Sequence, residues 1–303
     1  MRHKPIQGAC WMILAGSVFA IINTSLQYVG IEYAINSSSS VLFQYGIALL
    51  FFLPLMRKDA IKNAFESEFR LLHILRVLLS VIGIQLWTWA LAYPVPIWQG
   101  IALLMTSPLF ATIGSGLILK ESVHITRWMA TIVGFIGAMI ILKPWSDTFY
   151  WASLLPVGAA LFWASASLLT KFTVSQDSPI TIVFYLLALM LPFNLILGLP
   201  QLTLPDVWQP WFLLIFIGAL TAFAQWTVAK AYAVADASFV QPFDTLKLPF
   251  NILAGYIVFQ WIPPGTLWLG SLLIVGSVLF VTEYENKHSL IEKLWKKYKF
   301  KRH

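Results

Sequence analysis

The sequence predicts an all-α integral membrane protein with ten transmembrane helices, arranged as two inverted five-helix repeats. Of its 303 residues, 59% are hydrophobic and only 11% are charged, whereas about a quarter of the residues of a soluble domain are charged. Long apolar runs recur along the chain, and a helix needs about 17 to 25 such residues to cross a bilayer. Similar motifs also recur about half a chain apart, which indicates an internal duplication.

The ten predicted helices correspond to ten apolar runs joined by short connections. The first run follows Arg2 and Lys4 as a signal peptide would, but it extends to Val29 and more runs follow, so we interpret it as a spanning helix. The predicted spans are Gly8–Val29, Ser38–Met56, Leu71–Tyr93, Trp98–Leu119, Thr126–Leu142, Ala152–Phe172, Pro179–Leu197, Trp211–Tyr232, Ser238–Trp261 and Gly265–Thr282.

The basic residues predict the orientation of the helices. If the N-terminus is cytoplasmic, the opposite side carries only Lys143, because positive charge next to short loops stays in the cytoplasm. We therefore expect a multi-pass protein of the cell inner membrane with both termini cytoplasmic. This orientation accounts for the net charge of +7, and no nucleic-acid-binding module accompanies that charge. The residues on the cytoplasmic side would be Arg2, Lys4, Arg57, Lys58, Lys62, Arg70, Arg76, Lys120, Arg127, Lys171, Lys230 and the basic tail.

The internal repeat rests on three pairs of segments in the same order. Residues 87–93 read WTWALAY and residues 226–232 read WTVAKAY, which are identical at five of seven positions. The pairs TSPLF/KLPF, which align Pro108 with Pro249, and GFIGA/LIVGS follow in turn. Because five is odd, the second copy would be inverted in the membrane, as in many secondary transporters. The predicted units are residues 1–145, residues 146–284 and a basic cytoplasmic tail, residues 285–303.

The ninth predicted helix carries the strongest functional signal. Asp244, Lys247 and Asn251 lie at helical spacing within this apolar stretch, and ionisable groups at membrane depth normally face a cavity or a partner. Asp244 and Lys247 could neutralise each other as a structural pair. They could instead bind the ammonium and carboxylate of a zwitterionic solute, or Asp244 could hold a coupling proton. Asn251 would add a hydrogen-bonding group.

Aromatic and amide side chains in other helices complete the candidate substrate site. Tryptophans near span ends are expected to be interfacial anchors, whereas Trp87 and Trp163 sit deeper and Trp226 is the repeat partner of Trp87. Rings lining a cavity could stack on a solute, although helix packing explains each equally well. The remaining candidates are Asn23, Gln85 and Gln225 for the solute, Pro108 and Pro249 as hinges, and Trp11, Trp98, Trp145, Trp151, Trp208, Trp211, Trp261 and Trp268 as anchors.

No signature of an enzyme, a metal site or a cofactor site is found. The sequence contains no G-x-S-x-G, H-E-x-x-H or Walker motif. Cys10 is the single cysteine, and no cysteine and histidine cluster has metal-ligand spacing. We therefore expect neither catalysis nor a metal or cofactor.

Whole segments of the chain resemble the EamA-type, ten-span branch of the drug/metabolite transporter superfamily. These are Lys120-Glu121, RWMATIVGFIGAMIILKP from Arg127 and AYAVADASFVQPFDTLKLPFNILAGYIVF from Ala231. Residues 73–76, the Trp87 motif and GFIG are more specifically similar to S-adenosylmethionine uptake transporters. The resemblance implies a central cavity lined by helices one, three, four, six, eight and nine, alternating access and no ATPase domain.

These observations together predict a secondary transporter of a small organic metabolite, with an amino-acid-like zwitterion favoured. S-adenosylmethionine or a nucleoside-like cation is the alternative solute. A non-transporting membrane subunit that binds lipid or a partner is the alternative class. We expect a monomer, because ten spans already supply both halves.

Overall fold

A computed structural model describes most of the membrane-spanning part of the chain. The described residues are 5–55, 70–93, 95–117, 125–147, 149–173, 179–234, 243–244, 246–277 and 279–280. The predicted basic tail, residues 285–303, and the Lys120-Glu121 motif lie outside them.

The first half of the chain forms five apolar spans. They are α1 (Pro5–Glu32), α2 (Ser37–Phe52), α4 (Arg70–Ala92), the pair α5 (Ile97–Leu104) and α6 (Ser107–Leu117), and α7 (Ile125–Leu142). A short 3-10 turn, η1 (Leu53–Leu55), ends the second span. The start of α2 has a clear local cause, because the Asn36 side chain accepts a hydrogen bond from the Ser38 backbone N–H at 2.9 Å.

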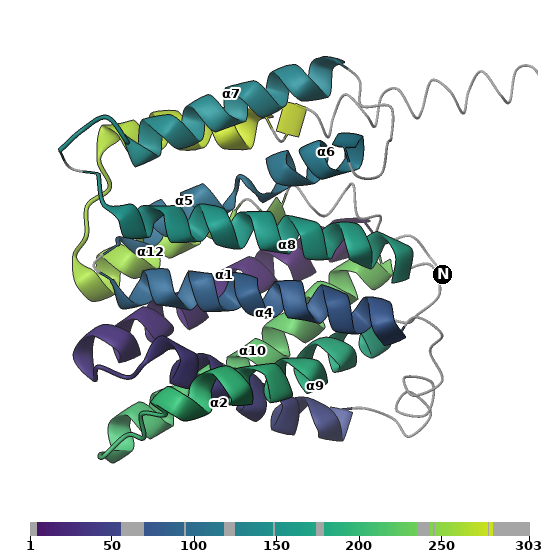
Figure 1. Cartoon of the computed structure of the whole chain (residues 1–303), viewed down its shortest axis with the longest axis vertical. Coiled ribbons are helices and arrows are strands. Elements are labelled where there is room, and N and C mark those ends of the chain that lie inside the picture. The colour runs from purple at the N-terminus through teal and green to yellow at the C-terminus, as the bar shows by residue number, and fades with distance from the viewer. Residues whose placement is uncertain are drawn as a thin grey trace, which may run out of the picture.

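The second half repeats this number of spans. It consists of α8 (Leu154–Thr173), α9 (Pro179–Gly198), α10 (Trp208–Val234), α12 (Lys247–Phe259) and the helix Gly265–Ser277. The 3-10 turns η2 (Trp151–Ser153) and η3 (Leu199–Gln201) flank α8 and α9. In Figure 1 the helices lie side by side, with α7 and the yellow C-terminal helix together at one face of the bundle.

Not every span is long enough to cross a bilayer by length and composition alone. Within the described residues four helices meet that criterion, in α1, α4, α9 and α10, and six shorter apolar helices accompany them. Counting α5 and α6 as one span gives the ten that the apolar runs predict. The all-α membrane fold with two five-helix halves is therefore confirmed.

The packing of the two halves follows a two-fold pattern. α1 packs on α10 as α4 packs on α8, and α1 packs on α12 as α6 packs on α8. In each comparison the helices correspond by their position in the two halves: α1 to α8, α4 to α10, and α6 to α12. The two halves share their apolar interior, because the core cluster runs through α1, α2 and α4 into α9 and α10.

Two predicted spans are broken rather than continuous. The fourth span turns at Met105 and Thr106, between α5 and α6, and in the ninth span Leu246 forms a turn just before α12. The breaks precede Pro108 and Pro249, which occupy the first turns of α6 and α12. A proline in a first helical turn removes an N–H that has no intrahelical acceptor there, so it favours a helix start.

α7 and the helix Gly265–Ser277 approach each other through glycine. A Cβ atom on Gly137 would lie 2.6 Å from the carbonyl oxygen of Gly270, and one on Gly270 would lie equally close to the Gly137 oxygen. Small residues at such crossings let backbones pack closely in membranes.

We expect Gly137→Ala to lower the melting temperature of the purified protein, because backbone atoms must move apart. Overpacking of this kind costs about 1–3 kcal/mol, or a few degrees for a chain of this size. Gly276 occupies the matching position of the repeat motif, and a Cβ atom placed there would lie within 4 Å of no described residue beyond its own helical turn. Gly276→Ala is the matched control and should melt like the wild type; equal melting of the two variants would contradict the close contact.

Candidate functional site

Three predicted site residues from distant parts of the chain meet in the core. Asn23 on α1 donates its Nδ2 to Asn251 Oδ1 on α12 at 3.3 Å, and the Trp87 indole Nε1 on α4 donates to Asn23 Oδ1 at 3.2 Å. All are buried, Asn251 completely and Trp87 to 2% exposure. Asn251 also donates its Nδ2 to the Lys247 carbonyl at 2.7 Å. The contact joins the first half to the second.

Further polar atoms continue this contact along α1. Gln27 is fully buried and donates its Nε2 to the Val95 carbonyl at 2.8 Å. Its Oε1, the Thr24 hydroxyl and the Trp98 Nε1 are buried without a hydrogen-bond partner in the described part of the chain. We call Asn23, Thr24, Gln27, Trp87, Trp98 and Asn251 the polar track.

The unpaired atoms of the track indicate a binding function. A buried polar atom without a partner costs about 1–3 kcal/mol, so each one calls for an explanation such as a ligand. The track offers both donors and acceptors and carries no formal charge. The described residues contain no group of three or more metal-ligating side chains.

Asp244 and Lys247 form an ion pair at the start of α12. The Lys247 Nζ lies 2.6 Å from Asp244 Oδ2, and the side chains of Lys247 and Asp244 are 26% and 39% exposed respectively. The backbone of Lys247 passes close to α1, because a Cβ atom on Gly16 would lie 3.6 Å from the Lys247 backbone nitrogen. The prediction that both charges belong to one continuous helix is wrong, since Asp244 precedes the turn at Leu246. The pair nevertheless forms and stays partly open.

Gln85 lies in a different polar cluster. Its Nε2 donates to Asn194 Oδ1 on α9 at 2.7 Å, and its Oε1 accepts from the Ser38 hydroxyl on α2 at 3.0 Å. Gln85 and Ser38 border an open cavity of about 710 Å³ at the end of the bundle where α1 ends and α2 begins. Trp89 and Tyr93 add aromatic surface to its wall. The volume is within the range of small-molecule pockets.

The other aromatic candidates pack between helices. The Trp163 indole on α8 fills the space beside Gly83 of α4, where a Cβ atom would lie 2.6 Å from Trp163 Nε1. Trp226 on α10 makes an edge-to-face contact with Trp11 of α1 at 5.3 Å between centroids, and Lys230 Nζ lies 5.4 Å from its ring centre. Gln225 on α10 is half-buried. None of them is among the polar-track contacts described above.

The tryptophan at the start of α5 corrects one prediction. Trp98 was expected to be an interfacial anchor, but it is only 7% exposed and belongs to the core cluster. The prediction relied on the position of Trp98 near the end of a span. In the structure α5 packs against α1 and α12, so its first turn is covered by protein rather than by lipid. Thr24 was also missed, although it neighbours Asn23 and precedes Gln27 by one helical turn.

A buried basic cluster joins α4 to α9. The His73 ring stacks on Tyr185 at 4.2 Å, and Arg76 Nη2 lies 3.3 Å from His73 Nδ1 and donates to the Ile182 carbonyl at 3.2 Å. His73 and Arg76 are part of the sequence that resembles known transporters, and here they attach a helix of one half to a helix of the other.

Comparison with known proteins gives a consistent result. The model of the EamA-like transporter family matches residues 6–143 and again residues 150–283. A riboflavin transporter of Vibrio cholerae is 59% identical, over 97% of this chain and 98% of its own length. A riboflavin transporter of Rhizobium johnstonii is 44% identical over 93% of both chains. An S-adenosylmethionine uptake transporter of Rickettsia prowazekii is 27% identical, over 95% of this chain and 96% of its own length.

Proposed function

We propose, from the premise that this chain belongs to the EamA-like transporter family, that it carries riboflavin across the bacterial inner membrane. The observation that supports this most strongly is the 59% identity with a riboflavin transporter, which extends over nearly the whole of both chains. Family membership alone makes the chain a small-metabolite transporter. The finer assignment, to riboflavin, is our proposal.

The chemistry of riboflavin suits the polar track. Riboflavin is neutral near pH 7 and combines a flat fused-ring system with a hydroxyl-rich ribityl chain. One ring edge is an imide, in which an N–H lies between carbonyl oxygens. A carboxamide such as that of Asn or Gln offers a donor and an acceptor side by side, and can therefore pair with an imide edge. Gln27 and Asn23 provide such groups, while Trp87 and Trp98 provide aromatic surface.

The favoured amino-acid-like zwitterion is not supported by the relatives, which are named for riboflavin and S-adenosylmethionine. The ion pair suggests the physical reason. With Lys247 Nζ 2.6 Å from the Asp244 carboxylate, each charge already has its partner, so neither needs a charge on the solute. A mutually neutralised pair at the start of α12 is compatible with a neutral solute.

We further propose that the solute passes between the two halves by alternating access. In inverted-repeat transporters the site lies near mid-membrane, where the repeats meet and helices are interrupted. Here the hydrogen bond from Asn23 to Asn251 crosses between the halves, and α12 starts at an interruption. Rocking one half against the other would break this bond and expose the amides to solute.

Reconstitution in proteoliposomes tests the assignment. We expect the purified protein to accelerate equilibration of riboflavin across the membrane and riboflavin to raise its melting temperature, because a ligand bound only by the folded state stabilises it by mass action. S-adenosylmethionine and amino acids, assayed in parallel, should neither be transported nor raise the melting temperature. Lumichrome, which has the ring system without the ribityl chain, should compete if the ring edge is the recognised part.

If S-adenosylmethionine raises the melting temperature and is transported, while riboflavin does neither, the proposal is overturned. S-adenosylmethionine, for which the more distant relatives are named, would then be the solute. If no tested solute is transported although the protein melts cooperatively, the non-transporting alternative is favoured instead.

A further inference from the structure

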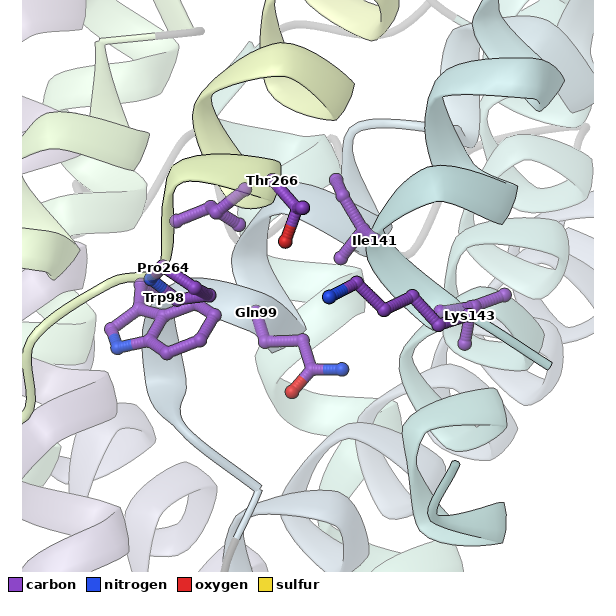
Figure 2. A pocket seen from close by; sticks show the side chains of 8 residues that line it. Trp98, Gln99, Ile141, Lys143, Pro264 and Thr266 are labelled. Atoms are coloured by element: carbon purple, nitrogen blue, oxygen red, sulfur yellow. The ribbon is translucent and has the colours of Figure 1, made fainter. Parts of the chain in front are cut away.

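A second, smaller pocket lies away from the polar track's amides. It is formed where the end of α7, the start of α5 and the start of the helix Gly265–Ser277 meet, and we call it the Lys143 pocket (Figure 2). Its volume is about 190 Å³, below the range of about 300–1,000 Å³ typical of pockets for drug-sized ligands. It is therefore too small for a fused-ring solute, but it has room for a compact group. Its lining residues are Trp98, Gln99, Ile141, Leu142, Lys143, Pro264, Thr266 and Leu267.

The Lys143 ammonium and the Thr266 hydroxyl point toward each other in this pocket, with Gln99 beside them (Figure 2). In Figure 2 the Lys143 ammonium extends from the end of α7 toward the space between the Thr266 hydroxyl and the Gln99 side chain. Among the described residues the ammonium has no ion-pair partner, even though Asp147 follows four residues later. Lys143 thus supplies a positive charge and Thr266 a hydroxyl donor. The Gln99 Nε2 donates to the Ser153 hydroxyl at 3.4 Å, and its second N–H is a further donor.

Helix ends add to the positive potential. Gln99 lies in the first turn of α5 and Thr266 in the first turn of the helix Gly265–Ser277. The backbone N–H groups of Gln99 and Leu267 already donate to the carbonyls of Pro96 and Pro264, at 2.9 and 3.0 Å. The contribution of these two helix starts is therefore the positive end of the helix dipole, which favours anions. Lys143 itself adopts a left-handed conformation, with φ of 46°, which few residues other than glycine adopt readily. That backbone turn accompanies the projection of its side chain into the pocket.

The surface around the pocket is strongly apolar. α7 exposes Met139, the turn after it exposes Trp145 to 69%, and the helix Gly265–Ser277 exposes Trp268 to 52% and Leu272 to 70%. In a chain that spans the membrane these side chains face lipid, and tryptophan marks the headgroup level. A cationic pocket at that level lies within reach of lipid phosphates.

We propose that the Lys143 pocket binds the phosphate of an anionic phospholipid, whose acyl chains lie along the exposed faces of α7 and the helix Gly265–Ser277. Lys143 pairs with the phosphate, and Thr266 and Gln99 donate hydrogen bonds to it. This site shares Trp98 with the polar track. Its phosphate-binding groups, on Lys143, Thr266 and Gln99, are not part of the track, so the proposal does not depend on the identity of the solute.

Native mass spectrometry of the detergent-purified protein, titrated with phosphatidylglycerol, tests this proposal. We expect Lys143→Gln to reduce bound phosphatidylglycerol several-fold and Thr266→Val to reduce it less, whereas Lys143→Arg should retain it. Lys230→Gln is the matched control, because Lys230 is an exposed lysine of α10 and is not among the residues that line the pocket. Diacylglycerol, which has the acyl chains but no phosphate, should bind weakly to every variant.

Equal retention of phosphatidylglycerol by wild type and Lys143→Gln would overturn the site, as would equal binding of diacylglycerol and phosphatidylglycerol. Cooperative melting of each variant excludes misfolding as the cause of a loss. A final experiment measures the melting temperature with orthophosphate. A Lys143-dependent rise in melting temperature with orthophosphate, without Lys143-dependent lipid binding, would overturn the lipid assignment in favour of free phosphate.

Discussion

Replacement of Asn23 by alanine is expected to reduce riboflavin transport by about tenfold to a hundredfold. The Asn23 amide accepts from Trp87 Nε1 and donates to Asn251 Oδ1, so its removal leaves a buried donor and a buried acceptor without partners. The variant also loses the amide proposed to pair with the solute, and one lost hydrogen bond of this kind costs about 1–3 kcal/mol, which at about 1.4 kcal/mol per factor of ten corresponds to about tenfold to a hundredfold. The loss should appear in initial rates of riboflavin flux into proteoliposomes, normalised to the amount of folded protein.

Gln44→Ala separates a transport effect from an effect on helix packing. Gln44 on α2 is also buried, and its Nε2 donates to the Thr221 hydroxyl on α10 at 3.0 Å. It joins the two halves as Asn23 does but lies outside the polar track. Its Oε1 is also buried without a partner in the described part of the chain, so the variant tests whether such an atom affects transport away from the track. Interhelical hydrogen bonds of this kind contribute about 0.6 kcal/mol on average, so this variant should melt slightly lower and transport normally. If both variants lose transport in proportion to their melting temperatures, the track has no special function.

Asp244→Asn and Lys247→Gln are each expected to reduce transport at least tenfold. Either change leaves the partner charge uncompensated at the start of α12, whereas the wild-type ion pair joins Lys247 Nζ to Asp244 Oδ2 at 2.6 Å. An unpaired charge within a spanning segment is unfavourable, so α12 is expected to shift from its position against Gly16. Flux measured at neutral pH in proteoliposomes is the test.

The double variant Asp244→Asn with Lys247→Gln distinguishes two functions of the pair. If the pair acts only by mutual neutralisation, removal of both charges should restore most of the flux. If Asp244 holds a coupling proton, the double variant should stay unresponsive to an imposed pH gradient that stimulates the wild type. Full activity of both single variants would remove the pair from the transport pathway.

Much of the fold could be predicted from local patterns. Apolar runs predicted all ten spans, including short ones such as α2 and α12, because burial in lipid requires an unbroken apolar surface regardless of partners. The motif pairs predicted two similar halves, and the family model matches the chain twice. The exact boundaries at residues 145 and 284 stay a prediction, as do the orientation of the termini and the monomeric state.

Proline was the signal for the breaks in two spans. Pro108 and Pro249 were interpreted as hinges that kink or break their helices, and each lies in the first turn of a new helix. The sequence does not say whether a proline kinks a helix or starts one, because both are compatible with its fixed φ and missing N–H. The choice depends on whether neighbouring groups accept the freed backbone atoms. Their function as hinges stays a proposal.

The candidate site was only partly visible in the sequence. Asp244, Lys247 and Asn251 could be selected because polar groups are conspicuous in an apolar run. Asn23 and Trp87 could be selected individually, but their assembly with Asn251 could not, since Asn23 and Asn251 are 228 positions apart. Trp98 was misassigned, and Gln85 belongs to the outer cavity instead of the track.

The sequence by itself determined that this chain is a helical membrane protein built from a doubled unit. It also determined that polar side chains lie within spanning segments, where their exposure to lipid is unfavourable. These properties depend on the transfer of side chains from water to lipid, which is additive along the chain and needs no knowledge of contacts. The tertiary structure alone decided which polar groups meet, which stay unpaired and where a lysine faces a pocket. Those outcomes depend on the directions of side chains on different helices, and only the packing of the two halves fixes them.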